Sequence, residues 1–551
     1  MAKPLFLIGM CTQGGPDPLS GRRFRPAEHL ALLGLFGLVL ATGCSDSDDP
    51  GAPPNVLLIS IDTLRADHLH CYGYERATSP RIDALASEGV LFERAVSSTS
   101  WTLPAHLSML TGLPVSAHGV CDDRLWTRNN SAGAPISPPL KGRFVSEDLA
   151  DAGYNTAGFF TWKYLEPQFG FGAGFDTWER LGHQFFTHPV VGPEFQRLRA
   201  AGDVEGLRAL AAKHPALFDD TLPSSPEVIE HASEWLGEQS ADDPFFLFVH
   251  LFDVHDPYTP PAPFDTMFDP DYTGPIDGRR ITSDDSPVRG DMPPRDLENL
   301  IARYDGGIAY VDHQVGELLD RLSALGLDEN TLVILTSDHG EEFFEHGHKT
   351  HRRQLHMESV HVPLVMRWPA SLPQGERVSG YVGIIDLAPS MLAACGIEAS
   401  VPLGGADLLP FARGLAENSK RTYTAELMLF DGSSAPERHL GVGTGLDWTI
   451  TRRRGDSTLD ELRIDLAADP LGRGNGAPLG TAMASEHSGL MQRIRESFGS
   501  LRAAQPERSG GLPQLTDHDR QQLAAMGYTS GGEFGEGDEN RLCIDGCIWP
   551  D

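Results

Sequence analysis

Four polar residues that lie far apart in the sequence have the types and local settings expected of a metal-dependent reaction centre. Asp62 follows the apolar run NVLLISI, and Asp338 and His339 follow the apolar run TLVILTS. Carboxylate and imidazole groups are common ligands of divalent cations. Each residue alone would more simply be a helix cap, but their shared placement after apolar runs favours a cation site.

Thr102, in the segment WTLPAH, could supply a nucleophile beside that site. Pro104 fits the first turn of a helix, so Thr102 is expected at or next to the helix N-cap. A hydroxyl at that position lies among free backbone N–H groups at the positive end of the helix dipole, which favours oxyanions. Metal coordination is one way to activate a Thr hydroxyl, which is otherwise a poor nucleophile. We therefore expect Asp62, Thr102, Asp338 and His339 to bind one divalent cation, although N-capping alone would also explain Thr102.

The segments around these residues predict an α/β fold, with a doubly wound, mostly parallel sheet flanked by helices. Continuous apolar runs are typical of parallel strands that are buried on both faces. Strands are expected at 55–61, 90–96, 155–158, 244–249, 331–336 and 362–366, and helices at Pro80, at Pro104 and over 308–322. Ligands of such sheets bind at the carboxyl ends of the strands, where Asp62, Asp338 and the segment 250–255 are expected to meet.

The pattern changes outside this region. Residues 180–240 are charged and helical and are expected to form an insertion, whereas 265–294, rich in Asp, Pro and Gly, is expected to be a surface loop. The catalytic domain is expected to span 55–400. A small antiparallel-sheet subdomain is expected within 401–530, with strands at 421–427, 440–443 and 448–452, a helix over 517–526 and a tail at 531–551.

The first 54 residues resemble an export segment followed by a tether. Arginines at positions 22, 23 and 25 precede an apolar run at 30–41, which is short for a membrane span but suits a secretory signal. Small residues before Cys44 and the acidic SDSDD after it resemble a bacterial lipoprotein signal. We predict a signal peptide at 1–43, an acidic tether at 44–54 and an exported protein facing the periplasm or the cell surface. Its membrane contact is expected only through lipidated Cys44, and an ordinary cleaved signal is the alternative.

The other cysteines indicate how few disulfides to expect, and the net charge limits the kinds of binding partner. Cys71, Cys121 and Cys395 are scattered and are expected to be core or unpaired residues. Cys543 and Cys547 could close a small loop in an oxidising compartment or remain free thiols. The formal net charge of −33 argues against a nucleic-acid partner, because such a surface repels phosphate backbones. The sequence indicates neither the natural substrate nor the oligomeric state.

Five segments resemble successive blocks of the sulfatase family, within the alkaline phosphatase superfamily. They are NVLLISIDTLRADHLHCYGY, WTLPAHLSMLTG, HLFDVHDPYTPP, SDHGEEFFEHGHKTHRRQLHMESVHVPLVMRWP and GIIDLAPSMLAACGI. The likeness covers 55–400, and RIDLAADP and LTDHDRQQLAAMGY resemble the C-terminal ending of the family. The resemblance implies an alkaline phosphatase-like fold and a hydrolase of sulfate or phosphate esters.

This sequence departs from the sulfatase family pattern at the residues of the expected active site. Thr102 stands where sulfatases with a formylglycine nucleophile carry Cys or Ser, and His106 stands at their Arg position. Thr cannot become formylglycine, because oxidation of its secondary alcohol gives a ketone. The usual Asp-Asp pair is Asp62-Thr63, the usual Asp-Asn pair is Asp338-His339, and only Lys163 could replace the residues that contact sulfate.

The set of Asp62, Thr102, Asp338 and His339 is similar instead to that of the phosphoethanolamine transferases of the superfamily, in which the Thr is transiently phosphorylated. That similarity implies two further catalytic histidines, His255 and His351, which protonate the leaving oxygen or bind a second ion. An imidazole ligand favours zinc or manganese over calcium or magnesium.

The sequence therefore predicts a metal-dependent hydrolase that acts on sulfate or phosphate esters of small molecules or glycans, with Thr102 as nucleophile. A phosphoryl transferase acting on an envelope lipid or glycan is the first alternative. A non-catalytic lipoprotein that kept the fold for binding is the second.

Several neighbouring residues allow two interpretations. His106 is a substrate contact or a helix-face histidine, and Asp253 either orients His255 or caps a loop. Arg65 is expected to be a salt-bridge anchor and Trp101 a core residue. The histidines at positions 346, 348 and 356 are expected to be mostly solvated or structural.

Overall fold

The computed structural model describes residues 52–121, 140–182, 224–240, 243–282, 286–416, 421–429 and 435–508, and a few residues between 191 and 214. Several sequence predictions lie outside the described residues. They are the signal peptide at 1–43 with Cys44 and most of the tether, the helix over 517–526, the tail at 531–551 and the pair Cys543 and Cys547.

A nine-stranded sheet forms the centre of the fold, with the strand order β11-β2-β10-β6-β1-β5-β3-β4 and β9 paired to β2. The strands are β1 (Asn55–Ile61), β2 (Val90–Val96), β3 (Asn155–Phe160), β4 (Thr177–Arg180), β5 (Phe245–Leu251), β6 (Thr331–Ser337), β9 (His361–Val362), β10 (Leu364–Arg367) and β11 (Glu376–Gly383). All neighbours are parallel except those that involve β9 and β10. The predicted mostly parallel sheet is therefore confirmed.

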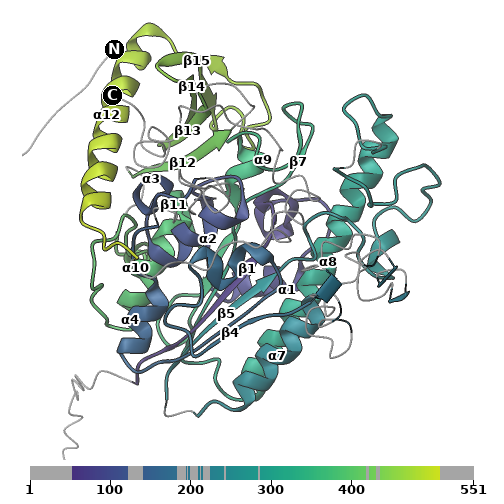
Figure 1. Cartoon of the computed structure of the whole chain (residues 1–551), viewed down its shortest axis with the longest axis vertical. Helices are drawn as coiled ribbons and strands as arrows, with labels where there is room; N and C mark the ends of the chain where they lie inside the picture. The colour runs from purple at the N-terminus through teal and green to yellow at the C-terminus, as the bar shows by residue number, and fades with distance from the viewer. Residues whose placement is uncertain are drawn as a thin grey trace, which may run out of the picture. The chain divides into compact units, whose positions relative to one another are not determined.

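Helices cover both faces of this sheet, as Figure 1 shows. One face packs on α2 (Thr102–Thr111), α4 (Val145–Asp151) and α10 (Leu387–Ala394), and the other on α1 (Pro80–Ser87), α7 (Ser225–Gly237) and α8 (Pro294–Ala324). Successive residues of β1 alternate between the two cores: Val56 and Leu58 join the first, and Leu57 and Ile59 the second. A continuous apolar strand is required here because both faces are buried.

A second, five-stranded antiparallel sheet follows in the order β12-β13-β14-β15-β16. Its strands are β12 (Thr422–Leu429), β13 (Glu437–Thr444), β14 (Asp447–Arg454), β15 (Ser457–Asp465) and β16 (Ala477–Pro478), and the long helix α12 (Thr481–Ala503) comes after them. Trp448 of β14 is fully buried in the first core, and its indole N–H donates to the Leu355 carbonyl at 2.8 Å. The antiparallel sheet was predicted, whereas α12 was not.

The other elements whose bounds the described residues define are short. They are α3 (Val115–His118), α9 (Met357–Val360), α11 (Leu409–Ala412), the hairpin of β7 (Glu342–Phe343) and β8 (Lys349–Thr350), and the 3₁₀ helices η1 (Ala66–His68), η2 (His70–Tyr72), η4 (Lys163–Leu165), η5 (Pro167–Phe169), η7 (Phe264–Thr266) and η8 (Ile384–Asp386). The described part of 265–294 is mostly turns and irregular chain, as expected for a surface loop. Within the described ranges, no helix is long and apolar enough to cross a bilayer.

The cysteines correct one expectation. Cys71 and Cys395 are free, as predicted. Cys121 is buried but disulfide-bonded, so the prediction that it is a core or unpaired residue was right about its burial and wrong about its pairing. An isolated Cys in a sequence gives no spacing from which a partner can be deduced.

Candidate active site

The sheet brings the predicted residues together because β6, β1 and β5 are adjacent and parallel. Asp62 comes directly after β1, and Asp338 and His339 come directly after β6. The register pairs Ile61 with Ser337, so the two strands end at the same level of the sheet. The carboxyl edge therefore gathers these side chains at one place, as predicted for an open parallel sheet.

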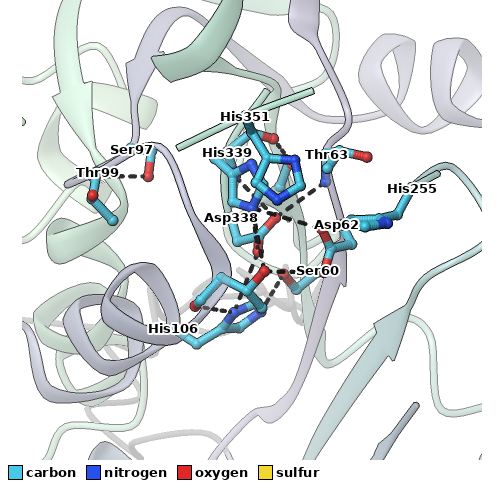
Figure 2. A network of polar contacts seen from close by, with 12 residues as sticks. Ser60, Asp62, Thr63, Ser97, Thr99, His106, His255, Asp338, His339 and His351 are labelled. Carbon is cyan, nitrogen blue, oxygen red and sulfur yellow. Dashed lines mark hydrogen bonds and ion pairs between the residues drawn. The ribbon is translucent and has the colours of Figure 1, made fainter. Parts of the chain in front are cut away.

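Thr102 completes this group from a different element. It is the first residue of α2, one position after the N-cap Trp101, and it is buried. Its Oγ1 lies 3.5 Å from Asp62 Oδ2 and 3.3 Å from His339 Nε2, which in turn lies 3.4 Å from Asp338 Oδ2. We call Asp62, Thr102, Asp338 and His339 the strand-end cluster. Figure 2 shows Asp62, Asp338 and His339 pointing toward one another.

His250 lies beside this cluster; the sequence placed it within the segment 250–255 at this edge but gave it no individual role. It is a fully buried residue of β5, and its Nε2 lies 3.3 Å from Asp62 Oδ2. Its Nδ1 is buried without a hydrogen-bond partner. The available signal was the apolar run PFFLFV ending in a polar residue, which is the same signal that identified Asp62.

His106 lies below the cluster and links two elements. Its Nδ1 lies 2.9 Å from the Thr102 carbonyl and its Nε2 lies 2.9 Å from Ser60 Oγ (Figure 2). Because a carbonyl only accepts, Nδ1 carries the proton and Nε2 accepts from Ser60. Burial, partly offset by the charge of Asp338, lowers the pKa of His106 to about 4. A neutral His106 thus joins the first turn of α2 to β1.

The backbone turns sharply directly after Asp62. Thr63 has a φ of 56°, in the left-handed region that a β-branched residue rarely adopts. Its N–H donates to Asp338 Oδ1 at 3.3 Å, and its carbonyl accepts from the Tyr304 hydroxyl at 2.7 Å. These contacts hold the strand end of Asp62 against that of Asp338.

The charge state of Asp62 suits cation binding. Burial raises its pKa, but the close contact with His250 and the charges of His255 and His339 outweigh burial and keep the pKa below its ordinary value. Asp62 Oδ1 and Asp338 Oδ2 are buried without hydrogen-bond partners. One ligand atom from each of Asp62, Asp338 and His339 lies within 4.8 Å of the others. Unsatisfied carboxylate oxygens and a ring nitrogen facing one point are a donor set that fits a divalent cation.

Two further predicted residues, His255 and His351, lie beside the cluster. Both are buried; the His351 ring lies 4.5 Å from the His339 ring and 4.9 Å from the His255 ring, measured between centroids. His255 Nδ1 lies 2.7 Å from the Asp256 carbonyl, and His351 Nδ1 lies 3.0 Å from Glu341 Oε1. Burial and the neighbouring His339 and His255 hold the pKa of His351 well below its ordinary value.

The structure decides between the interpretations left open for Asp253. Its carboxylate accepts from the backbone N–H groups of Ser224 and Ser225 at 2.6–3.0 Å, so it caps the start of α7. The residue that contacts the His255 Nδ1 side is Asp256, whose Oδ1 lies 3.3 Å away. An Asp near the end of a strand fits both roles equally well in sequence, and only the position of α7 separates them.

The other neighbours are placed as expected. Arg65 is buried and forms ion pairs with Asp67 and Glu345, which is the predicted anchor. Trp101 is buried in the first core. Lys163 is buried in η4.

The histidine-rich stretch is structural rather than solvated at two of its three positions. The side chain of His346 is 4% exposed and that of Glu358 is 2% exposed, and their ion pair measures 2.6 Å between Nδ1 and Oε1. His356 is 9% exposed, whereas His348 is an exposed residue. We call His346, His356 and Glu358 the hairpin cluster.

The chain matches two protein-family models and is similar to several curated sulfatases. Residues 54–397 match the family model described as "Sulfatase", and residues 344–487 match the model described as "N-sulphoglucosamine sulphohydrolase, C-terminal". Among curated relatives, an arylsulfatase of Clostridium perfringens is 25% identical over 61% of this chain and 73% of its own length. The human iduronate 2-sulfatase is 27% identical over 73% of this chain and 75% of its own length.

Solved structures show the same fold. The phosphonate monoester hydrolase of Agrobacterium radiobacter superposes with a TM-score of 0.58 at 23% identity, over 82% of this chain and 95% of its own. A protein solved in complex with its substrate D-glucosamine-2-N,6-O-disulfate has a TM-score of 0.62 at 18% identity, over 83% of this chain and 100% of its own.

Proposed function

This chain belongs to the sulfatase family, and from that premise we propose that it hydrolyses sulfate or phosphate esters with Thr102 as the nucleophile beside a divalent cation. Its curated relatives are hydrolases of sulfate esters by name, and a structural neighbour is a phosphonate monoester hydrolase. One observation carries the proposal: the buried Thr102 hydroxyl lies 3.5 Å from Asp62 and 3.3 Å from His339.

Asp62, Asp338 and His339 are the residues that would hold the cation. Bound there, a divalent cation supplies Lewis-acid polarisation of the ester oxygen and a lowered pKa for a nearby hydroxyl. The His339 imidazole favours zinc or manganese over calcium or magnesium, because imidazole is a common ligand of zinc and a site that mixes carboxylates with imidazole also suits manganese. Thr at position 102 excludes the formylglycine route of the family by its own chemistry.

The first half-reaction follows from the contacts of Thr102. The hydroxyl gives its proton toward Asp62 Oδ2, and Oγ1 attacks the phosphorus or sulfur in line as the bond to the leaving oxygen breaks. The start of α2 directs backbone N–H groups and the positive dipole end at the oxyanion that develops there.

The two histidines have different hydrogen-bonding roles. Burial raises the pKa of Glu341 well above its ordinary value, so the protonated carboxyl donates to His351 Nδ1. His351 then carries its own proton at Nε2. As this proton passes to the leaving oxygen, Nδ1 takes the proton of Glu341, so the ring stays neutral and Glu341 becomes a carboxylate. His255 donates its Nδ1–H to the Asp256 carbonyl, which leaves Nε2 as an acceptor for the proton of the water that releases Thr102.

The alternatives differ in what releases Thr102. In a phosphoryl transferase an acceptor alcohol of an envelope lipid or glycan takes the place of water, and the Thr-Asp-His set supports that reading more than a formylglycine sulfatase. In a binding lipoprotein no ester bond breaks. We also propose export and anchoring through a lipidated Cys44, which the lipobox-like sequence supports.

Steady-state rates on aryl sulfate, phosphate monoester and phosphodiester substrates test the proposal. We expect Thr102→Ala to lose turnover by about 10³-fold or more while it retains the bound metal. Thr99→Ala is the control, because Thr99 is another buried threonine three positions away. Equal turnover of wild type and Thr102→Ala contradicts the proposal, and release of product only with an added alcohol identifies the transferase.

A further inference from the structure

The hairpin cluster lies outside the residues used in the proposed reaction. His346 lies in the turn between β7 and β8, and His356 and Glu358 lie at the start of α9. The rings of His346 and His356 stack face to face, with centroids 3.7 Å apart and planes at 14°. One ligand atom from each of His346, His356 and Glu358 lies within 4.8 Å of the others.

The hydrogen bonds around His356 determine which of its nitrogens is available. Gln354 Nε2 donates to Glu358 Oε1 at 2.9 Å and to Glu342 Oε2 at 3.0 Å, which fixes the orientation of the amide. Gln354 Oε1 therefore accepts from His356 Nδ1–H at 2.9 Å. The lone pair of the neutral imidazole is then on Nε2, which is buried without any hydrogen-bond partner.

His346 is held in a complementary way. Its Nε2 lies 3.2 Å from the Gly474 carbonyl, which only accepts, so Nε2 carries a proton. Its Nδ1 faces Glu358 Oε1 at 2.6 Å across a shared proton. Each histidine thus gives one ring N–H to a fixed protein oxygen and directs the other nitrogen into the cluster. This is the arrangement that orients histidines in metal sites.

The geometry points to a second divalent-cation site, of the zinc class, formed by His346 Nδ1, His356 Nε2 and Glu358 Oε1. Two imidazoles and one carboxylate are a known three-ligand set for zinc, with a fourth position left for water. Binding displaces the proton shared by His346 and Glu358, because the ligand atoms must be unprotonated. The two stacked rings open from their 14° angle so that the ion lies in the plane of each ring.

Such an ion fastens the segment that carries His351. The backbone of α9 already contacts the start of this segment, since Glu341 N–H donates to the Glu358 carbonyl at 3.0 Å and Gly340 N–H to the Ser359 carbonyl at 2.9 Å. A Cβ at Gly340 would lie 2.0 Å from the Glu358 carbonyl oxygen. The backbone of the segment at Gly340 therefore lies as close to the backbone of α9 as a glycine allows. The site joins the hairpin turn to α9 on the other side of His351.

Metal stoichiometry of the full chain tests this inference independently of catalysis. The protein is stripped, dialysed against Co²⁺ alone, and its cobalt content and visible absorption are measured. We expect two equivalents for wild type, and one each for His356→Gln and for Asp338→Asn, which disables the strand-end cluster instead. His348→Gln, an exposed histidine of the same hairpin, retains both and is the control.

Each outcome decides. If His356→Gln binds as much cobalt as wild type, the site does not exist and the hairpin cluster is a proton-sharing pair beside a neutral histidine. If circular dichroism shows that His356→Gln fails to fold, Asp338→Asn decides: one tightly bound equivalent supports the site, and none overturns it. Loss of turnover in Asp338→Asn tests only the proposed reaction at the strand-end cluster. The proposed reaction and the cation site at the hairpin cluster can therefore fail separately.

Discussion

The strand-end cluster and the hairpin cluster use similar side chains but are built in opposite ways. The strand-end cluster is assembled from the ends of β1 and β6 and the start of α2, and it contains a hydroxyl and two carboxylate oxygens without hydrogen-bond partners. The hairpin cluster comes from residues 346–358, contains no hydroxyl, and is hydrogen-bonded except at His356 Nε2. Polar groups that lack hydrogen-bond partners and are held by rigid elements far apart in sequence are suited to catalysis. A local, hydrogen-bonded cluster is suited to holding two segments of the chain together.

The largest effect should follow from removing a charge at the strand-end cluster. Asp338→Asn replaces a buried carboxylate by a neutral amide of the same shape, and we expect turnover to fall by about 10³-fold or more with loss of one metal equivalent. Parallel activity and metal measurements check this. The control is Asp243→Asn, a change at an exposed carboxylate. Turnover within tenfold of wild type (roughly the scale of a supporting residue) would remove Asp338 from the reaction centre.

A second prediction concerns Arg65, which joins the chain after β1 to the β7–β8 hairpin that carries His346. Arg65 donates to both oxygens of Asp67 at 2.8 and 2.9 Å and to the Glu341 carbonyl at 2.9 Å, and pairs with Glu345 at 2.5 Å. Because Arg65→Met leaves these acceptors without their partner, we expect the free energy of unfolding to fall by about 3–5 kcal/mol. A urea titration monitored by circular dichroism measures this change in the free energy of unfolding.

The control for Arg65 is Arg289→Met, which breaks an exposed pair with Asp291. Exposed pairs contribute about 1 kcal/mol or less, so the midpoint should barely move. Equal losses in the two variants would show that Arg65 is not an anchor.

Much of the strand-end cluster could be predicted from sequence because each member follows or begins a recognisable element. Asp62 and Asp338 could be placed at the edge of the sheet because each ends an apolar run. Thr102 could be placed at the start of a helix because of Pro104. The run PFFLFV placed the segment 250–255 at the same edge, but His250 was given no role because the sequence does not show which polar residue of that segment contacts Asp62. The hairpin cluster was missed for a different reason: the contacts of His346 and His356 depend on the amide of Gln354 and the carbonyl of Gly474, which no periodicity encodes. The same holds for Asp253, whose role depends on where α7 begins.

A third prediction uses a buried histidine in neither cluster to calibrate pH effects. His118 accepts from the Val120 N–H at Nδ1 and contacts Ser108 Oγ through Nε2, and burial lowers its pKa to about 3. Since the unfolded chain binds a proton near pH 6.5 and the folded chain only near pH 3, stability falls as the pH drops between these values. We expect a loss on the order of 4 kcal/mol across that window. Thermal melts of wild type and His118→Gln check it: the variant should lose less stability on acidification, and parallel profiles would contradict the assignment.

The smallest predicted effect lies beneath the strand-end cluster. Ser60→Ala removes the donor to His106 Nε2 and leaves that nitrogen buried and unpaired, which should cost about 1–3 kcal/mol of stability. Chemical denaturation measures this, with Ser87→Ala as the control because Ser87 is an exposed residue that donates to the Ala84 carbonyl. If both variants unfold at the same denaturant concentration, His106 does not depend on Ser60 for its position.

The central claim is that the Thr102 oxygen forms the covalent bond to the transferred group. Its most direct test is acid quenching of the protein during turnover of a phosphate or sulfate ester, followed by peptide mass mapping, with His255→Ala used to slow release. We predict a phosphoryl or sulfuryl group on the peptide that contains Thr102, more abundant in His255→Ala and absent in Thr102→Ala. An active protein that carries this group on another residue would contradict the account.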